Sequence, residues 1–141
     1  MAGYSGTPLP RKLGIKPGAT LAVHNAPTGF DAILGDLPNG VRRAGDSDPG
    51  VDVLIAFHVS RGGLGSAFPA QARRIAPNGG FWVAWPKRTS GVPTDLTEDV
   101  LCEVLLPTGL VDNKVCAIDD TWSGLRFVVR KEHRAAWPPA W

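Results

Sequence analysis

Short apolar segments alternate along the chain with stretches in which apolar residues recur every three or four positions. Val51 to Phe57 is the clearest short segment, because it is rich in β-branched residues, carries one charge and has the length of a strand. Thr20 to His24 and Phe81 to Trp85 have the same character. Strands that are covered on both faces read as nearly continuous apolar runs. The pattern therefore predicts three buried strands in one sheet.

Helical spacing of apolar residues predicts helices between these strands. Residues 30–37 form a short segment of this kind, and residues 64–75 form a longer one. Pro69 either begins the longer helix or kinks it, because proline lacks the N–H that a helix interior needs. Arg73 and Arg74 lie off the apolar stripe, so we expect both side chains to face water.

A third helix is predicted near residue 95 by its cap as well as by its apolar stripe. Asp95 and Glu98 have the spacing of a capping box, and Thr94 is a competing N-cap residue. Apolar residues follow at helical spacing up to residue 105. Pro107 and Gly109 then end the helix.

Two further strands are predicted near the C-terminus, at residues 111–118 and 125–130, with turn residues between them. Strands alternating with helices and followed by a hairpin are typical of a three-layer α/β sandwich, with a mainly parallel sheet and a C-terminal antiparallel hairpin. We expect this domain to span residues 19–134. An N-terminal arm over residues 1–18 precedes it, and a flexible tail rich in proline and tryptophan follows over residues 135–141.

Composition indicates one folded domain without a strong electrostatic field. The chain has 141 residues, of which 43% are hydrophobic, and a formal net charge of +2. We therefore do not expect nucleic-acid binding. Cys102 and Cys116 lie among apolar residues and outside any metal-ligand spacing, so we expect buried, reduced thiols and no metal site. No apolar run is long enough for a membrane span, and we expect a cytoplasmic protein without a membrane partner.

Two stretches resemble class I methyltransferases. Residues 12–18, the strand after them and Thr28-Gly29 look like the approach to the nucleotide loop of that family, and residues 75–83 are similar to a later helix-to-strand passage. The resemblance implies a Rossmann-like fold. It also implies a glycine-rich loop after the first strand, where backbone amides hold a cofactor.

The loop from His24 to Gly29 departs from that family. Gly29 is its only glycine, and Pro27 has no N–H to offer. His24 and Asn25 add bulk where a cofactor needs room. We therefore expect a methyltransferase-like fold that lacks the usual cofactor loop, with no cofactor and, in particular, no S-adenosylmethionine bound there.

A second resemblance covers nearly the whole chain. Residues 2–9, 82–87, 90–97, 114–119 and 121–125 resemble a bacterial family of small proteins from actinobacteria, a domain of unknown function with no established activity. It implies a bacterial, cytoplasmic protein of the same fold. It implies no mechanism.

Polar and aromatic residues follow the predicted C-terminal ends of the three buried strands, where open α/β sheets bind ligands. We call this edge the rim. The candidate residues are His24 and Asn25; His58, Ser60 and Arg61; and Trp85, Lys87 and Arg88, with Thr94 and Asp95 at the start of the third helix. A helix N-terminus beside two cations favours an anion.

Structural roles explain the same residues. Thr94 or Asp95 would already satisfy the helix amides, and Lys87 and Arg88 would then be solvated loop residues. His24 and His58 form either a proton-transfer pair or two hydrogen-bonded structural histidines.

Taken together, these patterns predict a non-catalytic cytosolic module that binds a protein partner or a small anionic ligand. The alternative is an enzyme that depends on S-adenosylmethionine or a nucleotide and uses an altered loop. A third hypothesis is a homodimer or structural module that uses the N-terminal arm or Trp137 and Trp141.

Overall fold

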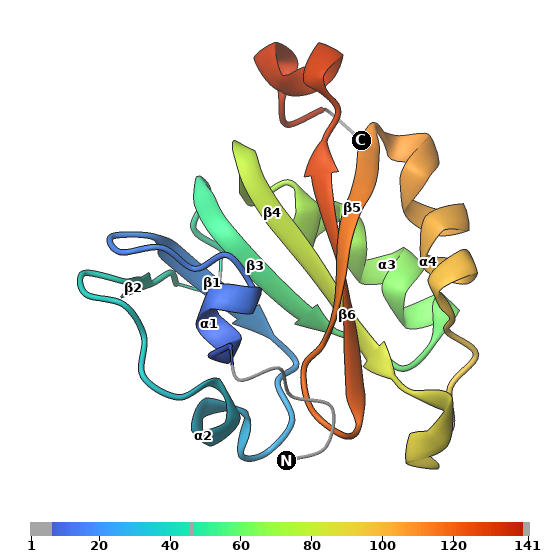
Figure 1. The fold of residues 1–141 in the computed structure, drawn as a ribbon. Coiled ribbons are helices and arrows are strands. Elements are labelled where there is room, and N and C mark those ends of the chain that lie inside the picture. The colour runs from blue at the N-terminus through green and yellow to red at the C-terminus, as the bar shows by residue number, and fades with distance from the viewer. Residues whose placement is uncertain (1–6, 46, 140–141) are drawn as a thin grey trace.

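Six strands form one sheet in the computed structural model, which describes residues 7–45 and 47–139. The strands are β1 Thr20–His24, β2 Arg42–Arg43, β3 Val51–Phe57, β4 Ile75–Pro86, β5 Leu110–Ala117 and β6 Trp122–Val129. Their order is β2-β1-β3-β4-β6-β5 (Figure 1). The first four run parallel, and β6 pairs antiparallel with both β4 and β5. This confirms the α/β fold with a mainly parallel sheet and a C-terminal antiparallel hairpin.

Helices cover both faces of the sheet and complete three layers. The helices are α1 Leu9–Lys12, α2 Phe30–Leu34, α3 Arg61–Ala72 and α4 Glu98–Leu105, with 3₁₀ turns η1 Arg88–Ser90, η2 Leu106–Thr108 and η3 Lys131–Ala136. The short α1 and α2 lie on one face, and α3 and α4 lie on the other (Figure 1). No helix in the described part of the chain is long and apolar enough to cross a membrane.

Each face of the sheet carries its own apolar core. In β3, Leu54 and Ala56 face α3, whereas Val53 and Ile55 face α1 and α2, as the alternation of side chains along a strand requires. On the α1 face Trp82 is fully buried, and its indole N–H donates to the Leu13 carbonyl at 2.9 Å. The described part of the N-terminal arm is thereby held on the sheet.

Strand β4 is longer than the sequence predicted. The sequence predicted a strand from Phe81, but residues 76–80 between it and the predicted helix also belong to β4. The register shifts here, because Val51 pairs with Ile75 but Val53 pairs with Gly80. A Cβ on Gly79 would lie 2.7 Å from the Val51 carbonyl, so glycine permits the close approach of the two backbones at this irregularity.

Helix α3 begins before the predicted apolar stripe. It starts at Arg61, and Pro69 lies inside it rather than at its first turn. Ser60 is the N-cap residue. Glycines at positions 62, 63 and 65 weaken the local helical pattern, so the start depends on this cap and on packing.

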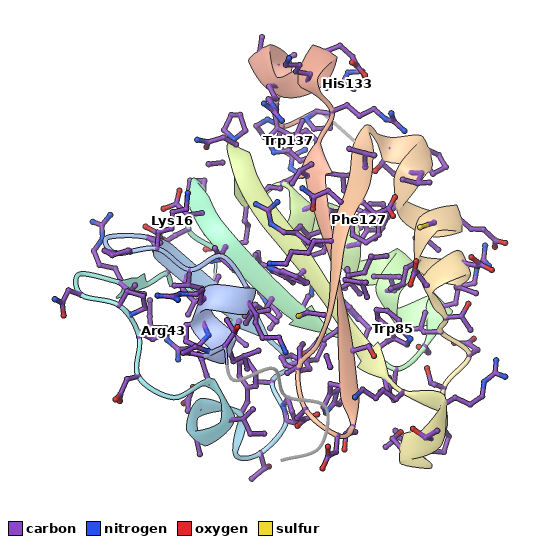
Figure 2. All side chains as sticks on the ribbon, in the orientation of Figure 1. Lys16, Arg43, Trp85, Phe127, His133 and Trp137 are labelled. Carbon is purple, nitrogen blue, oxygen red and sulfur yellow. The ribbon has the colours of Figure 1, made fainter. Side chains whose placement is uncertain are left out.

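The predicted tail includes Trp137, which packs against the rest of the chain, and Trp141, which lies outside the described residues. Trp137 is 9% exposed, and its indole N–H donates to the Ile75 carbonyl at 3.1 Å (Figure 2). Arg73 donates to the Pro139 carbonyl at 2.8 Å. The segment up to Pro139 is therefore docked beside the first residue of β4.

The two cysteines are free thiols, as predicted, but they are half-buried rather than fully buried. Loss of hydration raises the pKa of both thiols. Among the described residues no group of three His, Cys, Asp or Glu side chains is arranged to hold a metal ion.

Candidate functional site

The predicted rim forms, because β1, β3 and β4 are parallel neighbours. His24 pairs in register with Ala56, and Phe57 pairs with Ala84. The C-terminal ends of the three strands therefore meet at one edge of the sheet. The candidate side chains at this edge do not converge on a single point, however, and most of them make contacts within the chain.

The loop after β1 is closed onto the neighbouring strand. Asn25 has a left-handed backbone, with φ of 59°, which asparagine tolerates better than most residues. Its side-chain amide donates to the Phe57 carbonyl at 3.3 Å. Below the loop, the rings of Phe57 and Phe30 meet edge to face with centroids 4.9 Å apart. The side chains of Asn25 and Phe30 thus pack against the end of β3, in the space between the loop and that strand.

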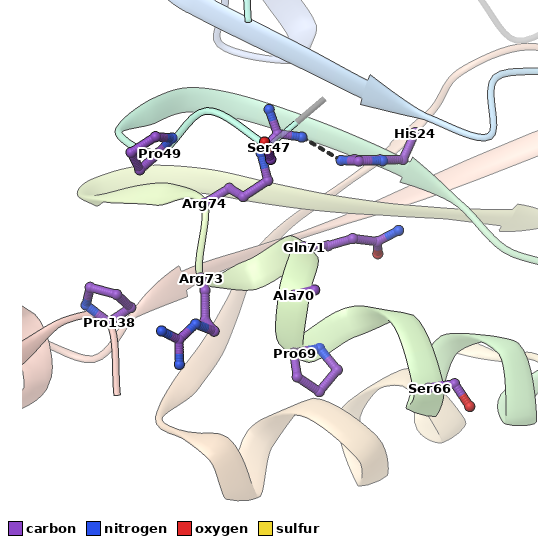
Figure 3. Close-up of a pocket in the computed structure, with 10 residues that line it drawn as sticks. All are labelled: His24, Ser47, Pro49, Ser66, Pro69, Ala70, Gln71, Arg73, Arg74 and Pro138. Carbon is purple, nitrogen blue, oxygen red and sulfur yellow. Dashed lines mark hydrogen bonds between the residues drawn. The ribbon is translucent and has the colours of Figure 1, made fainter. Parts of the chain in front are cut away.

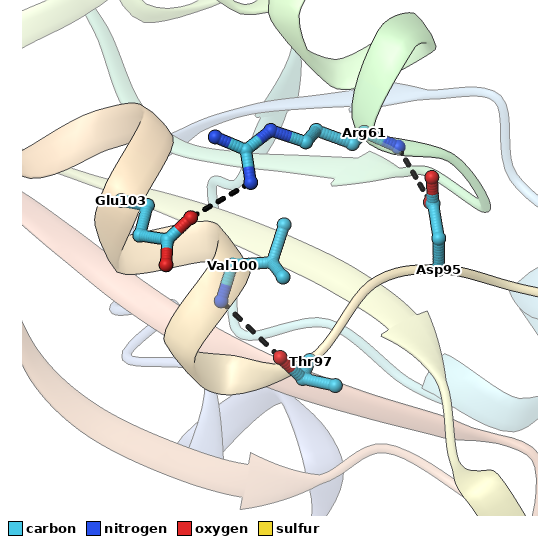
Figure 4. A network of polar contacts seen from close by, with 5 residues as sticks. All are labelled: Arg61, Asp95, Thr97, Val100 and Glu103. Atoms are coloured by element: carbon cyan, nitrogen blue, oxygen red, sulfur yellow. Dashed lines mark hydrogen bonds and ion pairs between the residues drawn. The ribbon is translucent and has the colours of Figure 1, made fainter.

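Two amides of the first turn of α3 are satisfied by the chain's own side chains, and Figure 4 shows the first of these contacts, between Arg61 and Asp95. The Asp95 carboxylate accepts from the Arg61 N–H at 2.7 Å, and the Ser60 hydroxyl accepts from the Gly63 N–H at 3.0 Å. An internal carboxylate thus occupies the position that a bound anion would take at this helix.

Asp95 does not cap α4, which corrects the sequence prediction. Helix α4 begins at Glu98, and Thr97 is its N-cap, accepting from the Val100 N–H at 3.2 Å. Thr94 donates its hydroxyl to the Val59 carbonyl at 2.6 Å, which ties the segment before α4 to the end of β3.

Arg61 links α3 to α4 at the surface. Its guanidinium donates to the Glu103 carboxylate at 2.7 Å, and both side chains are exposed (Figure 4). Because Arg61 also presents its backbone N–H to Asp95, one residue connects α3 to both the start and the middle of the α4 segment. Ser60, Arg61 and Asp95 therefore have evident structural roles.

The third group of candidate residues is split between core and surface. Trp85 is buried in the core on the α3 face. Lys87 donates its backbone N–H to the Thr121 carbonyl, and Arg88 is exposed at the start of η1. A shallow hollow of about 430 Å³ beside Trp85 and Arg88 is also lined by Asp95 and Glu98, so its charge is mixed.

The two candidate histidines point toward α3 but bind different partners. His58 is buried, and its Nε2 lies 3.0 Å from Oε1 of Gln71. Burial lowers the pKa of His58, and the hydrogen bond with Gln71 partly offsets this shift. The Nε2 atom of His24 lies 2.6 Å from Nη1 of Arg74. An arginine guanidinium only donates, so His24 accepts through Nε2. No hydrogen bond joins the two rings among the described contacts.

Arg74 is the polar residue that the sequence placed incorrectly. We expected it to face water, but it is 7% exposed. Its guanidinium donates to the carbonyls of Asp48 and Gly45 as well as to His24. The Asp48 carboxylate accepts from the Gly45 N–H instead. No described carboxylate forms an ion pair with Arg74.

A pocket of about 630 Å³ lies beside this buried guanidinium, and we call it the α3 pocket (Figure 3). Its polar lining comes from His24, Ser47, Ser66, Gln71, Arg73 and Arg74. Prolines at positions 49, 69 and 138 supply apolar walls. None of the described residues that line it is acidic. Of the predicted rim residues, only His24 reaches it.

Local sequence patterns give one clue to this pocket. Gln71 falls on the same helical stripe as Leu64 and Phe68, so a buried polar group on α3 was predictable from spacing. No local pattern marks Arg74. Its burial depends on the loop before β3, which crosses to reach it from 26 or more positions away in the chain.

The overall fold is similar to solved methyltransferases. A Sulfolobus solfataricus protein assigned to the type 11 methyltransferases matches with a TM-score of 0.58 and 9% identity, over 87% of this chain and 90% of that chain. A TehB-like SAM-dependent methyltransferase from Corynebacterium glutamicum matches with a TM-score of 0.57 and 16% identity, over 92% and 91%. The DhpI–SAH complex matches with a TM-score of 0.56 and 13% identity, over 88% and 83%.

No protein-family model matches the sequence, and no curated protein matches it. At identities of 9 to 16%, the similarity to solved structures establishes a methyltransferase-like, Rossmann-like fold and nothing about activity.

Proposed function

We propose that this protein is a non-catalytic module that binds a small anionic ligand in the α3 pocket. The observation that carries the proposal is Arg74, a buried cation with no carboxylate partner among the described residues, beside a pocket with a second arginine. Concave sites with a few convergent polar groups and apolar walls are the usual form of small-molecule sites.

The electrostatics of Arg74 favour an anion. A guanidinium removed from water loses hydration energy, which hydrogen-bonded or charged partners must restore. Two backbone carbonyls, an imidazole and the nearby C-terminal end of α3 supply only partial negative charges. An oxyanion in the pocket would add charge-assisted hydrogen bonds, which are stronger than bonds between neutral groups.

We propose a bacterial, cytoplasmic setting for this module, on the strength of the resemblance to the actinobacterial family. That resemblance adds no ligand. A protein partner remains the second class of binding partner, and a partner without any small ligand is one outcome of the experiment below.

The alternative function is an enzyme that binds S-adenosylmethionine or a nucleotide at the rim. The fold favours it, since solved neighbours include a SAM-dependent methyltransferase and a complex with SAH. The contacts of Asn25 with Phe57 and of Asp95 with Arg61 weigh against it, because they occupy positions where a rim ligand would need space and free amides.

A thermal-shift panel tests these functions, because a ligand that binds only the native state raises the unfolding midpoint. The panel contains inorganic phosphate, small organic phosphates and carboxylates, nucleotides and S-adenosylmethionine. We expect anions to raise the midpoint, and we expect Arg73→Gln to reduce that effect. A rise with S-adenosylmethionine that survives Arg73→Gln would favour the enzyme. No rise with any compound, together with a partner recovered by pull-down, would replace the small-ligand proposal with a protein-binding one.

A further inference from the structure

We infer that the α3 pocket takes an amphipathic anion, with one phosphate or carboxylate head joined to an apolar body about the size of an aromatic ring. The inference rests on the proposed anion-binding function and specifies its ligand class. Three features of the pocket support the inference: the N–H donors of its polar residues, its apolar walls and its volume.

The donors come from Arg74 and Gln71. A guanidinium has five N–H groups, and three of those of Arg74 have acceptors, at Asp48, His24 and Gly45. Two N–H groups remain. Gln71 is 6% exposed and uses its Oε1 atom with His58, which leaves its amide nitrogen without a described acceptor. Both residues line the pocket, so two largely buried side chains that carry unused donors border the same space.

An oxyanion matches this set of donors better than a neutral group or a cation does. A phosphate or carboxylate offers several lone pairs and can accept from more than one N–H of an arginine. The described lining contains two arginines and no acidic residue. A cationic ligand would therefore meet repulsion and would find no carboxylate to pair with.

The rest of the pocket fits an apolar body. Pro49, Pro69 and Pro138 line it together with Ala70, and proline rings present apolar surface without a backbone donor. A volume of about 630 Å³ lies within the range that suits organic ligands rather than bare inorganic ions. A five-atom phosphate would leave these walls in contact with water. A ring attached to the anion would cover them and gain hydrophobic binding energy.

Calorimetric titration of the full chain with four probes tests the ligand class. The probes are inorganic phosphate, phenyl phosphate, benzoate and benzyl alcohol. We expect phenyl phosphate to bind at least about tenfold more tightly than inorganic phosphate, because burial of the ring adds hydrophobic energy. We expect benzoate to bind and benzyl alcohol to bind at least about tenfold more weakly than phenyl phosphate.

The outcomes separate this inference from the proposed function. Equal affinity for inorganic phosphate and phenyl phosphate would overturn the apolar body and leave anion binding intact. Equal affinity for benzyl alcohol and phenyl phosphate would overturn anion binding itself. Binding of none of the four probes would overturn both.

A charge series at Ala70 locates the ligand. Ala70 is exposed on α3 and lines the pocket, so substitutions there should leave the fold intact. We expect Ala70→Glu to weaken phenyl phosphate binding about tenfold or more through charge repulsion, and Ala70→Gln, of the same size, to weaken it less than about threefold. Val115→Glu adds the same charge on β5, at an exposed position outside the pocket lining, and should leave affinity unchanged.

Two results of this series would count against the inference. Equal weakening by Ala70→Glu and Ala70→Gln would mean that the site responds to size alone, which contradicts an anionic ligand beside α3. Unchanged affinity in both variants would place the ligand outside the α3 pocket.

Discussion

The two ends of α3 differ in whether their charged groups have partners within the chain. At the first turn, Asp95 and Ser60 accept backbone amides, and Arg61 is paired with Glu103. Beyond the last turn, Arg74 is buried and has no carboxylate among its described partners. The charged side chains at the first end are paired within the chain, whereas the guanidinium beyond the second end has no described carboxylate partner.

This difference is the reason that we place the proposed ligand site near the C-terminal end of α3. A helix N-terminus favours anions in general, but an internal carboxylate already fills the one in α3. A helix C-terminus favours cations, and here it lies close to a buried guanidinium whose charge is only partly matched. The site that we propose therefore lies beside the unmatched charge of Arg74 and away from the helix N-terminus that the sequence indicated.

Loss of Arg74 should have the largest effect on stability. Arg74→Met removes the donor for two loop carbonyls and for His24, and we expect it to lower the free energy of unfolding by about 2 kcal/mol in urea denaturation. Arg73→Met is the matched control, because Arg73 is the exposed neighbour, and it should cost about 0.5 kcal/mol or less. Equal losses in the two variants would mean that burial does not distinguish them.

Acidification should destabilise the protein through His58. Burial lowers the folded-state pKa of His58 below its ordinary value of 6.5, so the unfolded chain takes up the proton first as pH falls. The stability contributed by neutral His58 is fully present above about pH 6.5 and is lost as pH falls toward the folded-state pKa. The slope from one such group does not exceed about 1.4 kcal/mol per pH unit.

Urea titrations at several pH values measure this slope. His58→Asn should be less stable at neutral pH but should lose stability less steeply on acidification. His133→Asn, at an exposed position, should keep the wild-type slope. An unchanged slope in His58→Asn would show that other groups cause the loss of stability at low pH.

Cap substitutions should distinguish the starts of α3 and α4. Thr97→Ala removes the N-cap of α4 and Asp95→Ala removes the carboxylate at α3, and each should cost about 1 kcal/mol. Asp95→Ala should also expose an amide at the start of α3 to anions. If Thr97→Ala had no effect while Thr94→Ala destabilised α4, as seen by hydrogen exchange, the observed helix start would be contradicted.

The smallest effect should come from the exposed ion pair between Arg61 and Glu103. Exposed pairs are screened by water and restrict two flexible side chains. We expect a double-mutant cycle with Arg61→Ala and Glu103→Ala to give a coupling of about 0.5 kcal/mol or less, falling with added salt. A coupling above about 1 kcal/mol would show that this end of α3 depends on charge more than its exposure implies.

The sequence predicted β1 and β3 to the residue, because buried parallel strands have apolar runs with sharp ends. It misplaced the N-cap of α4, which is Thr97, two residues early at Asp95 or three residues early at Thr94. Thr94, Asp95 and Thr97 are all good N-cap residues and lie within four positions. Only the structure shows that Asp95 accepts the Arg61 N–H at the start of α3 and is therefore not the cap of α4.

The candidate site was predictable only in part. Parallel strands ending at one edge placed the backbones of His24 and His58 correctly relative to each other. The directions of their side chains depend on Gln71 and Arg74, which reach them from α3 and the residue after its C-cap. The spacing of Gln71 gave a periodic signal, but the contacts of Arg74 gave none, and the α3 pocket was missed for that reason.

The placement of the histidines has a practical consequence for spectroscopy. The chain has three histidines, of which His24 touches the guanidinium beside the pocket, His58 lies one strand away and His133 is exposed. Nitrogen-15 chemical shifts of the three imidazoles would therefore report on three environments, which are the contact with Arg74, the buried hydrogen bond with Gln71 and the solvent. No foreign label would have to be introduced to read all three.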